Sequence, residues 1–235
     1  ASRYLKESSA KRALLFFATL VFGWSWILFF LTSEVVNLPE RAPIELWLLD
    51  AYNLLGAFVM PHFAAAIILQ IIAFLTFDAW IREPHQRQIA ILTLVLFLDA
   101  IIQPYVVLMT MPIFGILTAY HIWIRKTISL KQALWLVIPA IAHGGIVVFQ
   151  YVMIAGDPIW SDFSAQNSTQ SPPPHYYILG YLLLLIPIVI GWRHIRDAVR
   201  EDDGWLLPLV WILVVIVLLY APFPTQRRYL LGVQT

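Results

Sequence analysis

The sequence predicts an all-α protein, a polytopic bundle of about seven transmembrane helices that forms one integral membrane domain over residues 1–235. Composition, long apolar runs and an uneven distribution of cations support this prediction. Hydrophobic residues make up 60% of the chain, charged residues only 12%, and the mean hydropathy is +0.77. Soluble domains usually carry about 25% charged residues. This composition would therefore expose far too much apolar surface in water.

The apolar runs locate the spans, because a spanning helix needs roughly 20 mainly apolar residues. From Ile89 to Ile124 the chain has 36 largely apolar residues, too many for one helix and slightly few for two. Pro104 and Pro112 fall inside this stretch, and an interior proline kinks or ends a helix because it removes a hydrogen bond. We therefore predict a proline-broken hairpin here. Uninterrupted spans are predicted over residues 13–32, 58–80, 133–154, 177–192 and 205–221.

The distribution of Lys and Arg predicts the orientation, since cytoplasmic loops carry an excess of these residues. With residues 1–12 inside the cell, twelve cations fall on the inner side and three on the outer side. The prediction is a protein of the inner (plasma) membrane with a cytoplasmic N-terminus and an outer tail over residues 222–235. The inner cations are Arg3, Lys6, Lys11, Arg12, Arg82, Arg87, Arg125, Lys126, Lys131, Arg193, Arg196 and Arg200; the outer ones are Arg41, Arg227 and Arg228.

Two predicted outer loops, residues 33–57 and 155–176, are long enough to carry function. In the first, residues 44–57 have helical periodicity and are expected to lie flat on the bilayer. The second ends in Ser171 followed by three prolines. Consecutive prolines favour a stiff, extended segment.

Composition also excludes several classes of function. The chain has no cysteine, which rules out disulfides, thiolate metal sites and thiol nucleophiles. Its net charge of +1 gives no support to nucleic-acid binding. No phosphate-binding loop, dinucleotide fingerprint or cluster of metal ligands is present, so no cofactor is evident from the sequence.

Polar groups converge on the predicted outer side, and Arg227 and Arg228 stand out among them because they break the usual charge distribution. Arginine suits phosphate, since its planar fork offers bidentate, charge-assisted hydrogen bonds. One interpretation is a lipid-phosphate site formed by Gln226, Arg227 and Arg228. The other is that the arginines anchor the last helix to headgroups, or pair with outer acids such as Glu45, Asp50 or Asp162. Supporting polar groups would be His62, Gln103, Tyr105, Asn167 and Gln170.

Asp99 is the acidic residue nearest the middle of a predicted span. A charge there costs at least about 2.5–3.5 kcal/mol on insertion scales, which makes Asp99 a functional candidate. The alternatives are a neutral carboxyl group, or a structural hydrogen bond to Gln103, its i,i+4 neighbour on the helix. Three histidines, His62, His121 and His143, are also candidates as ligands of a haem or chlorophyll. Each lacks a paired His spacing, and a satisfied polar contact is the competing interpretation.

An ordered set of short motifs resembles a known family. It begins with Leu46-Trp47 and Asp50, and continues through Pro61-His62-Phe63 and Ile102-Gln103-Pro104-Tyr105. It goes on through Ala165-Gln166-Asn167, Ser171-Pro172-Pro173-Pro174 and Leu179-Gly180-Tyr181, and ends in Tyr220-Ala221-Pro222-Phe223-Pro224-Thr225-Gln226-Arg227-Arg228. From about residue 13 to 232 the chain is similar to the C-terminal membrane half of bacterial GT-C-type glycosyltransferases.

The resemblance implies a polytopic helical fold that takes a sugar from a polyprenyl-phosphate carrier at the outer leaflet. It implies that Arg227 and Arg228 hold the carrier phosphate. In that family an outer-loop carboxylate acts as base or as ligand of a divalent metal. The front section that carries it has no recognisable counterpart here, which leaves Glu45 and Asp50 as candidates only. The competing hypothesis is a non-catalytic transmembrane subunit of a larger photosynthetic or respiratory complex.

Overall fold

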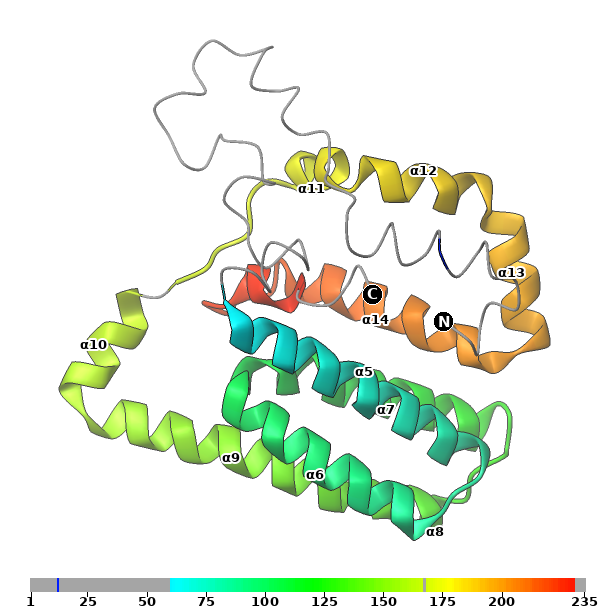
Figure 1. The fold of residues 1–235 in the computed structure, drawn as a ribbon, viewed down its shortest axis with the longest axis horizontal. Helices are drawn as coiled ribbons and strands as arrows, with labels where there is room; N and C mark the ends of the chain where they lie inside the picture. Colours follow the sequence, from blue (N-terminus) through cyan, green and yellow to red (C-terminus); the bar gives the residue numbers. More distant parts are fainter. Residues whose placement is uncertain (1–11, 13–59, 167, 231–235) are drawn as a thin grey trace. The chain divides into compact units, whose positions relative to one another are not determined.

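The computed structural model describes residue 12, residues 60–166 and residues 168–230. All regular structure within these residues is helical, as the sequence predicts (Figure 1). By their contacts they divide into two compact units. The large unit comprises residues 62–170 and 206–229, and the small unit includes residues 171–205. Each unit is described by itself.

The large unit begins with two antiparallel helices, α5 (Pro61–Arg82) and α6 (Gln86–Ile102) (Figure 1). A capping box starts α6, in which the backbone N–H of His85 donates to Oε1 of Gln88 at 3.0 Å. The helix ends at Gln103, whose φ of −139° and ψ of 76° are not helical. The next residue is Pro104, and a proline disfavours the helical conformation of the residue before it.

After this break the chain continues as η4 (Pro104–Val106) and α7 (Val107–Trp123). The structure therefore confirms the proline-broken hairpin. The break lies at Gln103 and Pro104 only, since Pro112 is accommodated inside α7.

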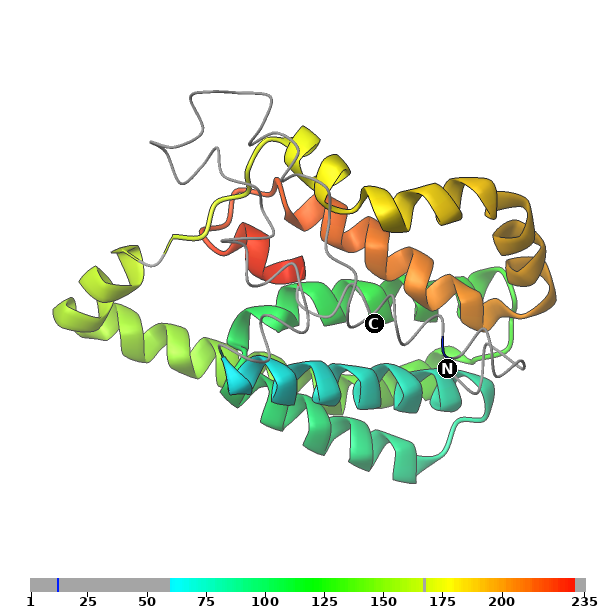
Figure 2. The same cartoon turned by 45° about the horizontal axis from the view of Figure 1, so that its top comes forward.

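The next three elements form one helical stretch, Leu130–Gly156. It consists of α8 (Leu130–Ala133), η5 (Leu134–Leu136) and α9 (Val137–Gly156). The stretch begins at Ser129, whose hydroxyl accepts from the Gln132 N–H at 3.3 Å while the Ser129 N–H donates to Gln132 Oε1 at 2.9 Å. α9 packs along α6 and also contacts α7 (Figure 2).

A short helix, α10 (Pro158–Gln166), replaces part of the outer loop expected over residues 155–176. Its start is explained by Asp157, whose Oδ1 accepts from the backbone N–H of Ile159 at 2.8 Å and of Trp160 at 3.3 Å. Proline at the first helical position costs no hydrogen bond. The N-cap aspartate and the proline therefore start a helix where the sequence predicted a loop.

Aromatic side chains hold α5, α7 and α14 (Leu206–Leu218) together. The rings of Phe77 and Phe114 stack with centroids 4.1 Å apart, and Phe74 meets Trp211 at 4.6 Å. The indole Nε1 of Trp211 donates to Sδ of Met109 at 3.1 Å. Pairs of this kind add about 0.5–1.5 kcal/mol each to the burial of their area. This core fixes the position of the tail, which follows α14 and contains η7 (Gln226–Leu230).

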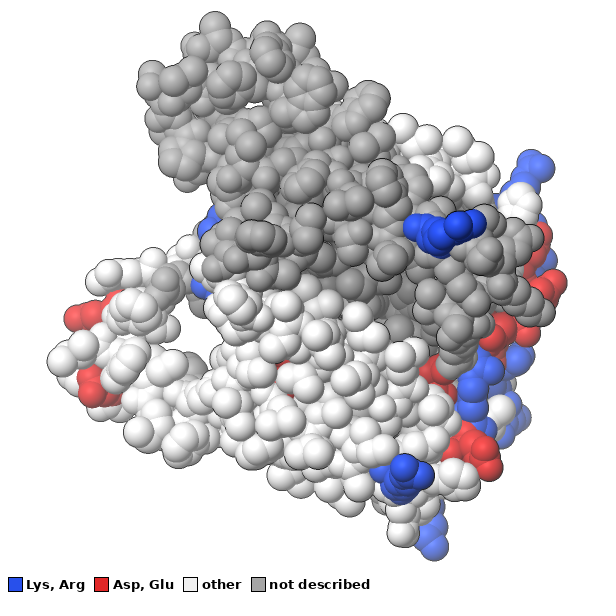
Figure 3. All heavy atoms as spheres, viewed as in Figure 1, with Lys and Arg blue, Asp and Glu red and all other residues white. Residues whose placement is uncertain are grey.

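Three of the described helical segments are long and apolar enough to cross a membrane, namely Pro61–Arg82, Pro104–Trp123 and Leu130–Gly156. Asp203–Leu218 is a shorter apolar helix. Many large apolar side chains point outward, and Figure 3 shows a nearly uncharged surface over α5 and α6, as expected of helices that face lipid. The expected span over residues 13–32 and the interfacial helix over residues 44–57 lie outside the described residues.

In the small unit, the span predicted over residues 177–192 is divided into α11 (Pro174–Gly180), α12 (Leu182–Ile190) and α13 (Trp192–Glu201). At the second break, the Gly191 N–H donates to the carbonyl of Pro187 at 2.8 Å. A Cβ at residue 191 would lie 2.9 Å from that same carbonyl oxygen, so the close turn requires glycine. Hydropathy alone did not reveal either break.

Candidate functional site

Two backbone hydrogen bonds at Thr169 hold the tail of the large unit. The Thr169 N–H donates to the carbonyl of Pro224 at 2.7 Å, and the Arg227 N–H donates to the carbonyl of Thr169 at 3.2 Å. Thr169 is buried, with 7% of its surface exposed. These bonds fix the backbone of η7 at the end of the unit where α6 ends and α7 begins. We call this the tail end; it corresponds to the predicted outer side.

At the tail end, Arg228 lies over the ring of Tyr105. The guanidinium carbon is 5.4 Å from the ring centroid, within the range of a cation–π interaction. Tyr229 meets the same ring edge-on, with centroids 6.4 Å apart. Tyr105 comes from η4, directly after the proline break, so the break positions the aromatic surface on which the arginine rests.

Tyr229 is the buried anchor of this cluster, with 1% of its surface exposed. Its hydroxyl lies 3.1 Å from that of Thr225, which fixes the ring from within the tail. Burial raises the pKa of the Tyr229 phenol above its usual value of 10, and the Thr225 hydrogen bond opposes part of that rise. The neutral phenol is therefore the stable form at ordinary pH.

The three predicted phosphate ligands differ in what they can offer. Gln226 donates through Nε2 to the carbonyl of Ala221 at 2.7 Å, so one of its two donor hydrogens stabilises the turn after α14. Arg227 is half-buried and its Nε is enclosed by protein. Arg228 is also half-buried, and no carboxylate among the described residues lies within ion-pair distance of it. Arg228 is therefore the best-placed anion ligand of the three.

Gln103 lies in the chain two residues before Tyr105 and is 2% exposed. Within the described part of the chain, its side-chain Nε2 has no hydrogen-bond partner. A buried, unsatisfied donor of this kind costs roughly 1–3 kcal/mol. Gln103 therefore has an unused amide donor, as expected of a supporting group for a phosphate ligand.

The other predicted outer groups are not brought into the cluster. His62 is exposed in the first turn of α5, where its ring meets Phe63 with centroids 4.8 Å apart. Gln170 is exposed and donates to the hydroxyl of Ser168 at 3.0 Å. Asn167 and the weak catalytic candidates Glu45 and Asp50 lie outside the described residues.

Asp99 is fully buried, but it does not form the predicted side-chain hydrogen bond with Gln103. The contact between these residues is through the backbone, with the Gln103 N–H donating to the Asp99 carbonyl at 2.7 Å. Neither carboxylate oxygen of Asp99 has a hydrogen-bond partner among the residues that the structure places. The side-chain hydrogen bond predicted between Asp99 and Gln103 is therefore not formed, and the helix ends here, since Gln103 has non-helical backbone angles.

Two of the three histidines considered as pigment ligands, His121 and His143, have hydroxyl neighbours. Nδ1 of His121 lies 2.9 Å from Oγ1 of Thr127, and Nδ1 of His143 lies 3.4 Å from Oγ1 of Thr110. His143 is fully buried. Among the described residues, no group of three or more His, Cys, Asp or Glu side chains could hold a metal ion. Satisfied polar contacts account for His121 and for one nitrogen of His143.

Sequence reasoning missed Thr169 and Tyr229, the two residues that fix the tail. Thr169 acts mainly through its backbone, which no side-chain pattern can reveal. The signal for Tyr229 was its place directly after Arg228, in a stretch that ends with apolar residues.

Comparisons of the chain with known protein families, with curated proteins and with solved structures find no match.

Proposed function

We propose that this protein is an integral membrane protein of about seven spans that binds the phosphate of a lipid at its tail end, on the outer side of the membrane. The proposed lipid is a polyprenyl phosphate, which is what the resemblance of the sequence motifs to GT-C-type glycosyltransferases implies. The observation that carries the proposal is the half-buried Arg228 guanidinium, which lies over Tyr105 with no described carboxylate to neutralise it.

The geometry favours a phosphate ligand for a physical reason. An arginine over an aromatic face keeps the N–H groups at its edge available, and that edge matches two phosphate oxygens. Charges in a half-buried site interact more strongly than in water, because the effective dielectric constant is lower. The Thr169 bonds and Tyr229 hold the tail in place, so little conformational entropy is lost on binding.

Anchoring to headgroups is the competing role for Arg228. A side chain that only snorkels to the interface needs no fixed aromatic support, and it does not discriminate between anionic lipids. Selectivity for one lipid phosphate therefore separates the two roles.

Sugar transfer would require a carboxylate in addition to the phosphate site. A positioned general base typically contributes about 10²–10⁴-fold to the rate. Glu45 and Asp50 stay the candidates for this group. The binding proposal stands independently of them, since it concerns the carrier phosphate alone.

The test is lipid retention measured by native mass spectrometry of the detergent-solubilised protein. We expect a long polyprenyl phosphate to bind, and the matching polyprenol to bind much more weakly. Arg228→Gln should weaken binding roughly 10- to 100-fold, the range for losing a charged hydrogen bond. Arg228→Lys should restore only part of it, because an ammonium lacks the planar fork.

Arg193→Gln is the matched control, since it removes one exposed cation from α13 in the small unit. It should leave retention unchanged. Equal binding by Arg228→Gln and the unaltered protein would overturn the proposal. Stoichiometric co-purification with other membrane proteins, without any bound polyprenyl phosphate, would favour the role of a non-catalytic subunit instead.

A further inference from the structure

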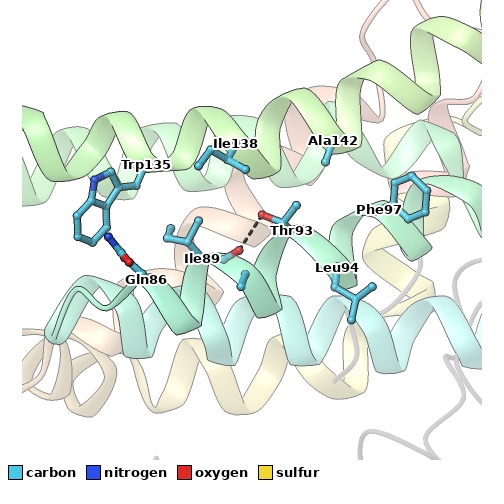
Figure 4. Close-up of a pocket in the computed structure, with 9 residues that line it drawn as sticks. Gln86, Ile89, Thr93, Leu94, Phe97, Trp135, Ile138 and Ala142 are labelled. Carbon is cyan, nitrogen blue, oxygen red and sulfur yellow. Dashed lines mark hydrogen bonds between the residues drawn. The ribbon is translucent and has the colours of Figure 1, made fainter.

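A long apolar groove runs between α6 and the stretch formed by η5 and α9, far along the chain from the tail. Its volume is about 640 Å³. Figure 4 shows Gln86 facing Trp135 at one end, and Phe97 near Ala142 at the other. The complete lining is Gln86, Ile89, Ala90, Thr93, Leu94, Phe97, Trp135, Ile138 and Ala142.

The groove offers almost no polar surface to a ligand. Ile89 is 5% exposed, whereas Leu94 and Ile138 are 59% and 57% exposed. The hydroxyl of Thr93 donates to the carbonyl of Ile89 at 2.7 Å, within its own helix (Figure 4). Only Gln86, at the end of the groove, presents a side-chain amide to it. A water-soluble ligand would therefore find no hydrogen-bond partners along most of its length.

The length of the groove matches one leaflet of a bilayer. Gln86 and Phe97 are separated by eleven helical steps, which is about 16 Å at a rise of about 1.5 Å per residue. Half of a hydrocarbon core of about 30 Å is about 15 Å. A second helix of about 10 Å diameter over this length would occupy roughly 1,300 Å³, about twice the volume of the groove.

The Gln86 end of the groove lies at the cationic end of the large unit. Both connections at this end, from α5 to α6 and from α7 to α8, appear side by side in Figures 1 and 2. Among the described residues of the unit, the acids near this end are Glu83 and Asp78, and Asp78 pairs with Arg82 at 3.5 Å. The cations there are Arg82, Arg87, Arg125, Lys126 and Lys131.

Two of these cations continue the walls of the groove. Arg87 precedes Ala90 by three residues and Leu94 by seven, which places it on the same face of α6. Lys131 precedes Trp135 by four residues in the opposite wall. Both side chains are exposed, and neither pairs with a carboxylate in the part of the chain that the structure describes.

We propose that this groove holds one acyl chain of an anionic phospholipid, whose headgroup phosphate is bound by Arg87 and Lys131. The acyl chain covers the apolar lining, and the cations at its end provide the charge complementarity. Basic pockets between helices on the cytoplasmic side recognise anionic headgroups in this way. This site is separate from the Arg228 cluster and independent of the function proposed above.

The test compares phosphatidylglycerol with phosphatidylcholine in native mass spectrometry of the detergent-solubilised protein. We expect one phosphatidylglycerol to be retained in preference. The double variant Arg87→Gln, Lys131→Gln should weaken its binding roughly 30-fold, because each cation near an anionic headgroup contributes roughly fivefold. The control Lys126→Gln, Arg193→Gln removes the same charge from residues that lie neither on α6 nor on the α8–α9 stretch, and should change binding little.

A second pair of variants tests the acyl chain itself. Ala142→Phe fills the groove without altering charge and should abolish preferential retention of phosphatidylglycerol. Ala90→Phe does the same from an exposed position on α6, in case the first variant fails to fold. Neither should affect polyprenyl-phosphate binding at the tail. Equal retention of both phospholipids, or full retention by the filled-groove variants, would overturn the proposal. The proposal would also be overturned if the unaltered protein were an oligomer and these variants dissociated it.

Discussion

The guanidinium of Arg228 lies over the ring of Tyr105, with 5.4 Å between its central carbon and the ring centroid. The two residues are far apart in the chain and meet because Pro104 breaks the hairpin and Thr169 holds the tail. This contact turns a surface arginine into a supported, half-buried cation. Its effect on lipid binding can be measured by replacing either Arg228 or Tyr105.

Replacing Tyr105 by Leu should weaken polyprenyl-phosphate binding, because the arginine loses its aromatic support. A cation–π interaction contributes about 0.5–2 kcal/mol, so a roughly 2- to 30-fold loss is expected. Tyr105→Phe should retain most of the affinity. Tyr151→Leu is the matched control, since Tyr151 is 72% exposed on α9. Native mass spectrometry measures all three; unaltered binding in Tyr105→Leu would show that the ring does not support the ligand site.

Thr169 is predicted to hold the tail mainly through its backbone, because its hydroxyl donates to the same Pro224 carbonyl only at the longer distance of 3.4 Å. Thr169→Val should leave the tail in place, whereas Thr169→Pro removes the N–H that donates to Pro224 at 2.7 Å. Hydrogen exchange at the Arg227 amide should then accelerate in the proline variant alone. Gln170→Pro controls for a proline at the neighbouring exposed position. Equal protection in Thr169→Pro would mean that the Thr169 bonds do not fix the tail.

Asp99 is buried without a hydrogen-bond partner for its carboxylate among the described residues, and is therefore expected to cost stability. Asp99→Asn keeps the shape of the side chain and removes the ionisable group. At a pH where the carboxyl is ionised, the replacement should raise the free energy of unfolding by about 1 kcal/mol or more, since a charge at mid-span is expensive. Thermal unfolding in detergent measures the change. A clear loss of stability would instead indicate that the carboxylate has a favourable partner in the folded protein.

The phenol of Tyr229 should titrate later than an ordinary tyrosine, because burial raises its pKa above 10. The sign follows from linkage: a folded-state pKa above the unfolded value gives stability below pH 10 that is lost as pH rises through the folded pKa. Ultraviolet titration of the unaltered protein, minus that of Tyr229→Phe, isolates this one phenol. A difference curve with its midpoint at or below pH 10 would contradict the burial of Tyr229 in solution.

The sequence predicted the parts of the fold that depend on long apolar runs and on proline. The broken hairpin and the helices near residues 58–80 and 133–154 follow from these signals. It did not predict α10, because a single N-cap aspartate and a proline started a helix in a polar segment. It also missed the breaks at Tyr181 and Gly191, since the close approach of Gly191 to Pro187 is a local backbone contact that hydropathy does not reveal.

The candidate site was predictable in composition but not in arrangement. The paired arginines were conspicuous because they broke the charge distribution, and Tyr105 lay beside the proline break. The partners that fix them, Thr169 and Tyr229, act through backbone bonds and ring packing, which leave no motif. The assignment of Asp99 to Gln103 failed for a related reason: i,i+4 spacing implies a contact only where the helix continues, and this one ends at Gln103.

The side of the membrane on which the tail lies is the condition for outer-leaflet lipid binding, and it can be measured directly. The chain has no cysteine, so Gln170→Cys, beside the Thr169 bonds, introduces a single thiol at an exposed position. A membrane-impermeant maleimide applied to intact cells should label it fully, and permeabilisation should add nothing. Labelling that occurs only after permeabilisation would place the tail and Arg228 inside the cell, and would contradict the account.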